Sequence, residues 1–177
     1  MSNLRLINKS TITSDVALLE VTDVFTTDFD VYKIVYEDFL VATGTDNFRM
    51  RLINSTGSVV VSTNYNTAGL NMRANASFVE RRETSSNKGV LPILSIDDGA
   101  AEGVSGVVYL FNPFSSSTYS FVVHQNTTWI NGNFYNNKTI GVLRELSSIT
   151  GFRLGQNDLS ENLASGTVKT YGIRVDT

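Results

Sequence analysis

The chain has no cysteine, which excludes disulfides, thiolate nucleophiles and cysteine-based zinc sites. It also has only two prolines and one histidine among its 177 residues. Charged residues make up 18% of the chain, and the formal net charge is -3. Because no basic surplus is present to neutralise phosphates, we expect no binding to nucleic acid.

Long hydrophobic segments are missing as well. No apolar run approaches the roughly 18 residues of a membrane-spanning helix, so we expect no insertion into a membrane. The N-terminal residues Met1–Asn8 carry a charge but lack the apolar stretch of a signal peptide. We therefore expect the protein to be made in the cytoplasm and to leave the cell only by lysis or inside a particle.

Small neutral polar residues are abundant instead. The chain contains 19 serines, 19 threonines and 17 asparagines, which disfavour the interior of helices and favour strands and turns. Hydrophobic residues, at 41%, are sufficient for a core. The length suits one domain, so we expect residues 1–177 to form a single β-domain.

The clearest strand pattern lies at the end of the chain, at residues 166–175. Val168 and Thr170 fall on one face of this segment, whereas Lys169 and Tyr171 fall on the other. Because the chain stops two residues later, we expect it to end inside its sheet, with little room for an appended enzyme.

Similar segments recur along the chain, at about the 8–12-residue spacing of sandwiches and barrels. The pattern therefore predicts an all-β fold of about ten strands, with helix only as a short turn at residues 98–102. We expect exposed loops at residues 81–89 and 126–137. The remaining strands are expected at residues 4–7, 16–25, 31–39, 47–53, 59–63, 106–111, 118–124, 140–146 and 149–154. Residues 70–80 could be a further strand with a polar edge, and residues 90–96 are apolar enough for a buried strand, although Pro92 argues for an edge or a bulge.

Four of these segments resemble one known family. Residues 25–34, 48–52, 149–152 and 165–172 are similar to strands of bacteriophage virion proteins, especially from marine and cyanobacterial phages. The resemblance runs from about residue 4 to the end and implies a single antiparallel β-sandwich of the jelly-roll type. It also implies a structural, head-decoration or tail-fibre role in the virion and assembly as a homotrimer, and it brings no catalytic residues with it.

His124 is the only histidine, and it lies at the end of an expected strand. It would be the base of a Ser-His-Asp triad, but no nucleophile-elbow motif accompanies it. One alternative is a structural or surface histidine. Another is a metal site formed by three copies of His124 on a trimer axis. We expect the structural role, and no catalytic residue, cofactor or metal.

Three carboxylates, those of Asp97, Asp98 and Glu102, fall within six residues. Such loops supply the oxygen ligands that calcium prefers, although the spacing does not match an EF-hand. The same carboxylates could be the acid and base of a glycosidase. Asp98-Gly99 is also a common turn, so an ordinary turn is the alternative.

The segment 126–137 is the strongest candidate for a binding site. It holds the only tryptophan, a Phe-Tyr pair and five asparagines, and aromatic rings with amides are suited to contact sugars. The alternative is that the two larger apolar rings pack inward around an ordinary Asn-Gly turn. The candidate contacts with a host glycan are Trp129, Asn131, Asn133, Phe134 and Tyr135.

These features favour a non-enzymatic virion component: a capsid-surface decoration, knob or short fibre that contacts other virion proteins. The expected trimer contact lies near residues 90–96 and 107–111. The alternative is a tail-fibre or baseplate protein that recognises host surface polysaccharide. A polysaccharide depolymerase is a third hypothesis, for which the sequence offers no recognisable acid–base pair.

Overall fold

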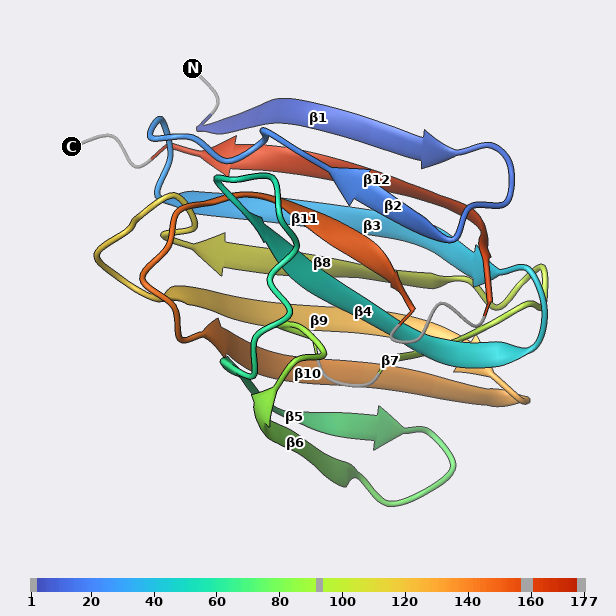
Figure 1. Ribbon diagram of the computed structural model, residues 1–177. Coiled ribbons are helices and arrows are strands. Elements are labelled where there is room, and N and C mark those ends of the chain that lie inside the picture. Colours follow the sequence, from blue (N-terminus) through green and yellow to red (C-terminus); the bar gives the residue numbers. More distant parts are fainter. Residues whose placement is uncertain (1–2, 92–93, 157–160, 175–177) are drawn as a thin grey trace.

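The computed structural model describes residues 3–91, 94–156 and 161–174. These residues form twelve strands and no helix, so the expected all-β class is confirmed and the expected number of ten strands is too low (Figure 1). None of the described segments is a helix that could cross a membrane. Residues 92 and 93, inside the expected strand 90–96, lie outside the described part of the chain.

The strands form two antiparallel sheets, which lie one over the other as two layers (Figure 1). The larger sheet has eight strands in the order β1 (Leu4–Ile12), β12 (Leu163–Ile173), β3 (Val31–Val41), β8 (Val104–Phe111), β9 (Ser120–Ile130), β10 (Asn133–Leu143), β5 (Tyr65–Arg73) and β6 (Val79–Ser86). The smaller sheet has four strands in the order β2 (Leu18–Val21), β11 (Ile149–Gln156), β4 (Thr45–Asn54) and β7 (Leu94–Asp97).

The core lies between the two sheets and follows from the alternation of the strands. In β3, every second residue from Tyr32 to Tyr36 is fully buried, as the period of two requires. The ring of Tyr36 lies 5.8 Å from that of Phe48 on the facing sheet. In β12, Val168 and Thr170 are buried, which confirms the face predicted for the final strand.

The larger sheet extends beyond the smaller one. Strand β7 is the last strand of the smaller sheet, and β10, β5 and β6 continue past it at the bottom of Figure 1. The segment after β6 covers part of this extension: the amide of Val90 donates to the carbonyl of Met50, 2.9 Å away. The inner face of the extension therefore meets this loop at Gly141 of β10, where the Val90 carbonyl lies close, and meets the smaller sheet at Glu83 of β6, which pairs with Arg49 of β4.

The loops expected at residues 81–89 and 126–137 are largely strands, and the strand expected at residues 70–80 is interrupted by a turn at residues 74–75. Residues 79–86 form β6, and residues 126–130 and 133–137 belong to β9 and β10. In both segments the side chains alternate between the two faces of the sheet, but most of the inward side chains are polar. A search for alternating apolar residues does not detect strands of this kind.

Three smaller expectations are also wrong. Residues 59–63 form no strand, and only Val59 makes an isolated bridge, to Ile53. Strand β2 ends at Val21, shortly before Asp23 adopts a positive φ of 56° that interrupts the extended backbone. Residues 98–102 form a turn, closed by a hydrogen bond from the Glu102 amide to the Gly99 carbonyl, rather than a helix.

Candidate functional site

The candidate site is built on the hairpin of β9 and β10. Asn131 and Gly132 form its two-residue turn, with φ values of 49° and 76°. Both central residues of a type I′ turn have positive φ, which explains why an Asn-Gly pair stands here. The turn also sets the register, in which Trp129 pairs with Phe134.

This register divides the five candidate residues between two faces. Trp129 and Phe134 lie side by side on the outer face of the larger sheet, 46% and 44% exposed, so the alternative in which they pack inward is wrong. Asn131 and Tyr135 line a pocket on the other side. Asn133 holds the turn, because its Nδ2 donates to the carbonyl of Asn131 and its Oδ1 accepts from Asn75.

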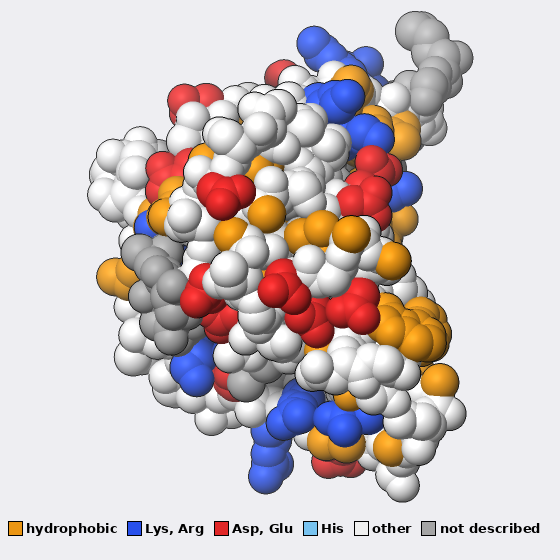
Figure 2. Space-filling model, turned by 90° about the vertical axis from the view of Figure 1, so that its right-hand side faces the viewer, with side chains coloured by type: hydrophobic (Ala, Val, Ile, Leu, Met, Phe, Trp, Pro, Cys, Tyr) orange, Lys and Arg blue, Asp and Glu red, His pale blue; other side chains and the backbone are white. Residues whose placement is uncertain are grey.

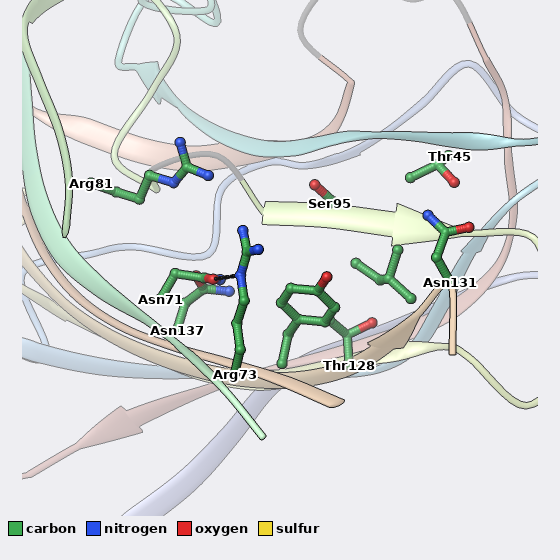
Figure 3. Close-up of a pocket in the computed structure, with 10 residues that line it drawn as sticks. Thr45, Asn71, Arg73, Arg81, Ser95, Thr128, Asn131 and Asn137 are labelled. Carbon is green, nitrogen blue, oxygen red and sulfur yellow. Dashed lines mark hydrogen bonds between the residues drawn. The ribbon is translucent and has the colours of Figure 1, made fainter. Parts of the chain in front are cut away.

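The pocket opens at the end of the sandwich where the larger sheet extends past the smaller one, and it has a volume of about 200 Å³. Its wall on the larger sheet begins with a row across three strands. Arg73 of β5 pairs with Tyr135 of β10, which pairs with Thr128 of β9. The described lining residues are Thr45, Asn71, Arg73, Arg81, Ser95, Thr128, Ile130, Asn131, Tyr135 and Asn137 (Figure 3).

The next row inward is made of three asparagines. Asn71 pairs with Asn137, which pairs with Asn126, and all three are buried. The Nδ2 of Asn71 donates to the Oδ1 of Asn137 at 2.8 Å, and the Oδ1 of Asn126 accepts from the Asn137 amide at 3.2 Å. The Nδ2 of Asn126 has no hydrogen-bond partner among the described residues. A buried amide donor without a partner is unusual in a folded protein.

Two arginines give the pocket its charge. Arg73 lies with its guanidinium 5.1 Å from the centre of the Tyr135 ring, and its Nε donates to the Oδ1 of Asn71 at 2.9 Å. Arg81 reaches the same pocket from β6, and both guanidinium groups point into it in Figure 3. Neither arginine forms an ion pair within the described part of the chain. The pocket can therefore attract an anionic group.

His124 lies in the row beyond the asparagines and is almost completely buried. Its Nε2 is 2.6 Å from the hydroxyl of Tyr36 and its Nδ1 is 2.9 Å from that of Thr139. Burial lowers the pKa of His124 to about 3 and raises the pKa of Tyr36 well above 10. The side chain faces the inside of its own protomer, so three copies could not meet on a trimer axis to hold a metal.

The three carboxylates predicted as a calcium or glycosidase site interact with groups close to them in the structure. The Oδ2 of Asp98 accepts from the Gly44 amide at 2.7 Å, and the Oδ1 of Asp97 accepts from the Asp98 amide at 2.9 Å. Desolvation and the nearby Asp97 raise the pKa of Glu102. Within the described residues, no group of three or more histidine, aspartate or glutamate side chains could hold a metal ion.

The charges are separated on this end of the sandwich. Figure 2 shows acidic side chains across the middle of the face and a group of basic side chains at the bottom. The basic group lies over the β5–β6 hairpin, which carries Arg73 and Arg81. Further basic side chains lie at the top of the same face, so the acidic side chains separate two basic regions.

A second surface lies on the outer face of the larger sheet, where an apolar groove of about 500 Å³ crosses β8, β9, β10 and β5. Two cross-strand pairs build it: Phe111 with Phe121, and Val123 with Ile140. Phe121, Val123 and Ile140 are 49%, 42% and 61% exposed. Contiguous exposed apolar residues of this kind can form a contact with another protein.

The two segments expected near a trimer contact lie in different places. In residues 90–96, the described side chains of Val90, Leu91 and Ile96 are buried in the core, and Ile96 belongs to β7 of the smaller sheet. They are therefore unavailable to another copy. Residues 107–111 belong to β8, and Phe111 contributes to the apolar groove on the outer face.

Comparison of the chain with protein-family models, with curated proteins and with solved structures finds no significant match. The residues that sequence reasoning missed are Asn71, Arg73, Arg81 and Asn137. The pairing of β5 with β10 brings these residues together, because it places residues more than 60 positions apart in the sequence side by side.

Proposed function

We propose that the protein is a non-enzymatic structural component of a bacteriophage virion, a capsid-surface decoration, knob or short fibre that assembles as a homotrimer. The observation that carries the proposal is the apolar outer face of β8, β9 and β10. This face has the composition of an assembly surface in a chain that is otherwise covered with neutral polar residues.

The proposed fold is an elaborated jelly roll. Four antiparallel pairs support it, in which β1 pairs with β12, β2 with β11, β3 with β8 and β4 with β7. These eight strands form two sheets of four, which is the arrangement of a jelly roll and of many viral capsid and lectin domains. The hairpins β5–β6 and β9–β10 are then additions that widen one sheet.

The proposed occupant of the outer face is a second copy of this chain. Packing around a symmetry axis brings copies of the same patch together, so a charged patch would repel itself. The groove residues of β8, β9 and β10 carry no charge, and Arg82 of β6 is the one charged residue among the described residues that line the groove. Three copies are proposed because trimers are usual in the family that the strands resemble.

Substitution of Ile140 tests the assembly. Ile140 is 61% exposed in the protomer, so Ile140→Lys leaves the core intact and places three charges on the proposed axis region. We expect sedimentation at micromolar concentration to give a trimer mass for the wild type and a monomer mass for the variant. Leu146→Lys is the matched control, because Leu146 is also 61% exposed but lies in the connection between β10 and β11.

A monomer mass for the wild-type chain at micromolar concentration contradicts the trimer. An unchanged trimer in Ile140→Lys contradicts the choice of surface. Dissociation by Leu146→Lys to the same extent as by Ile140→Lys contradicts it as well.

The second candidate function is host recognition, as a tail-fibre or baseplate protein that binds surface polysaccharide. It is favoured by the β9–β10 hairpin, which exposes Trp129 and Phe134 on one side and directs Tyr135 into a polar pocket on the other. Binding of the wild type on a glycan array, lost in Tyr135→Ala, supports this function. A wild-type chain that binds no glycan and no host cell counts against it.

A further inference from the structure

The pocket brings two guanidinium groups together without a counter-charge. Arg73 and Arg81 both point into a space of about 200 Å³ (Figure 3), and none of the described lining residues is acidic. Two like charges in a shared recess repel each other, and a bound anion would convert this repulsion into attraction. Arginine is suited to this role, because its planar fork binds a carboxylate or sulfate through two parallel hydrogen bonds.

The position of Arg73 is fixed before any ligand binds. Its Nε is held by Asn71, its guanidinium lies over the Tyr135 ring, and Asn71 is itself held by Asn137. The two terminal nitrogens of Arg73 donate no hydrogen bond within the described part of the chain, so they are left for a ligand. An arginine that is ordered in advance loses little conformational entropy when it binds. Arg81 is exposed and can adjust from the neighbouring strand.

The remaining walls are suited to a sugar. They carry neutral hydrogen-bonding groups, the hydroxyls of Thr45, Ser95 and Thr128 and the amide of Asn131, with Ile130 as the single aliphatic side chain. Such walls can pair with the several hydroxyls of one sugar ring. The volume of about 200 Å³ also fits a single sugar residue, because it lies below the roughly 300–1,000 Å³ of pockets for drug-sized ligands.

The two walls would also orient the ligand. The arginines stand on the larger sheet, whereas Thr45 and Ser95 belong to β4 and β7 of the smaller sheet. Thr45 pairs with Asp97, so negative charge lies on the side of these hydroxyls. A ligand with its anionic group toward Arg73 and its neutral hydroxyls toward Ser95 satisfies both sides.

We propose that this pocket binds an acidic sugar residue, one that carries a carboxylate or a sulfate group, within a host surface polysaccharide. The inference rests on the second of the two proposed functions, recognition of polysaccharide, and it adds the chemical class of the ligand. It does not depend on the assembly of the virion component.

The experiment is calorimetric titration of the full chain with four probes. Three are oligosaccharides of equal length, namely oligogalacturonate, a sulfated oligosaccharide and a neutral gluco-oligosaccharide, and the fourth is inorganic sulfate. We expect binding of one or both acidic oligosaccharides, and at least about tenfold weaker binding in Arg81→Gln and Arg73→Gln, because each loses a charged hydrogen-bond donor. The stronger acidic probe identifies carboxylate or sulfate as the recognised group.

Arg82→Gln is the matched control. Arg82 follows Arg81 on β6 and lines the outer groove instead of the pocket, so its loss removes the same charge from the opposite face. We expect wild-type affinity in this variant. Arg81 is exposed, so Arg81→Gln keeps the fold and remains informative if Arg73→Gln does not fold.

Each of the remaining outcomes contradicts a specific part of the proposal. Equal weakening by Arg82→Gln shows a general charge effect and contradicts the pocket. Equal binding of the neutral oligosaccharide leaves polysaccharide recognition standing and contradicts the acidic sugar. Binding of inorganic sulfate as tightly as the acidic oligosaccharides contradicts the role of the sugar ring. Binding of no oligosaccharide at all contradicts both the inference and polysaccharide recognition.

Discussion

The buried His124 predicts a specific dependence of stability on pH. In the folded chain its pKa is about 3, whereas a histidine in an unfolded chain has a pKa near 6.5. The unfolded state therefore binds a proton that the folded state does not bind between these two values. The stabilising contribution is complete above about pH 6.5 and is lost as the pH falls toward 3.

The magnitude follows from the two pKa values. Each pH unit below 6.5 costs about 1.4 kcal/mol while the folded histidine stays neutral. Between pH 7.5 and pH 4.5 the loss from His124 is therefore about 3 kcal/mol. The hydroxyls of Tyr36 and Thr139 could both accept from a protonated ring, so the loss comes from burial of the charge and not from a broken hydrogen bond.

Urea unfolding followed by circular dichroism, at one protein concentration, measures this term. We compare the wild type with His124→Gln, whose amide is neutral at every pH. The drop in unfolding free energy from pH 7.5 to 4.5 should be about 3 kcal/mol larger in the wild type than in the variant. The carboxylates contribute equally to both chains and cancel in this difference.

The protonation of His124 can also be measured directly by NMR spectroscopy. Since His124 is the only histidine, its ring protons give a single set of resonances whose titration is unambiguous. We expect no titration of the folded chain between pH 8 and about 4.5. A midpoint near 6.5 in the folded chain, or equal stability losses in the wild type and His124→Gln, would refute the reasoning.

Two further substitutions test the packing of the sheets. Gly106→Ala should lower the unfolding free energy by roughly 1–3 kcal/mol in urea titrations, because the new Cβ would stand 2.5 Å from the Tyr36 hydroxyl and 2.7 Å from the backbone oxygen of Gln125; wild-type stability would show that neither is in place. Glu83→Gln should cost about 3 kcal/mol, since it leaves the buried Arg49 guanidinium without the carboxylate now 3.1 Å away. Glu80→Gln, on the exposed side of the same strand, should change the midpoint little, and an equal effect of both variants would argue against the ion pair.

The parts of the fold that could be predicted from the sequence are those in which apolar residues alternate. Residues 31–37 and 166–173 form strands as expected, and Tyr32, Ile34 and Val168 are buried on one face of them, in keeping with the period of two. The β5–β6 and β9–β10 hairpins could not be recognised in this way. Their inward positions hold residues such as Asn71 and Asn126, and polar inward side chains remove the contrast on which the method depends.

The candidate site was predicted only in part for a related reason. Asn131 and Tyr135 stand out because the segment around them is rich in aromatic residues and amides, and the structure places both in the pocket. Arg73 and Arg81 are ordinary charges in the sequence. They become significant only when β5 pairs with β10 on one side and β6 on the other, a pairing between distant segments that no local pattern specifies.

The most direct test of the central proposal, a component of a virion, is an electron cryo-microscopy reconstruction of particles purified from a culture that expresses the gene for this chain. The account predicts density for three copies at each site on the capsid surface, in contact through the outer faces of β8, β9 and β10. Density on the tail instead would favour the host-recognition function. Absence of the chain from the particle, or copies that contact one another through a different face, would contradict the account.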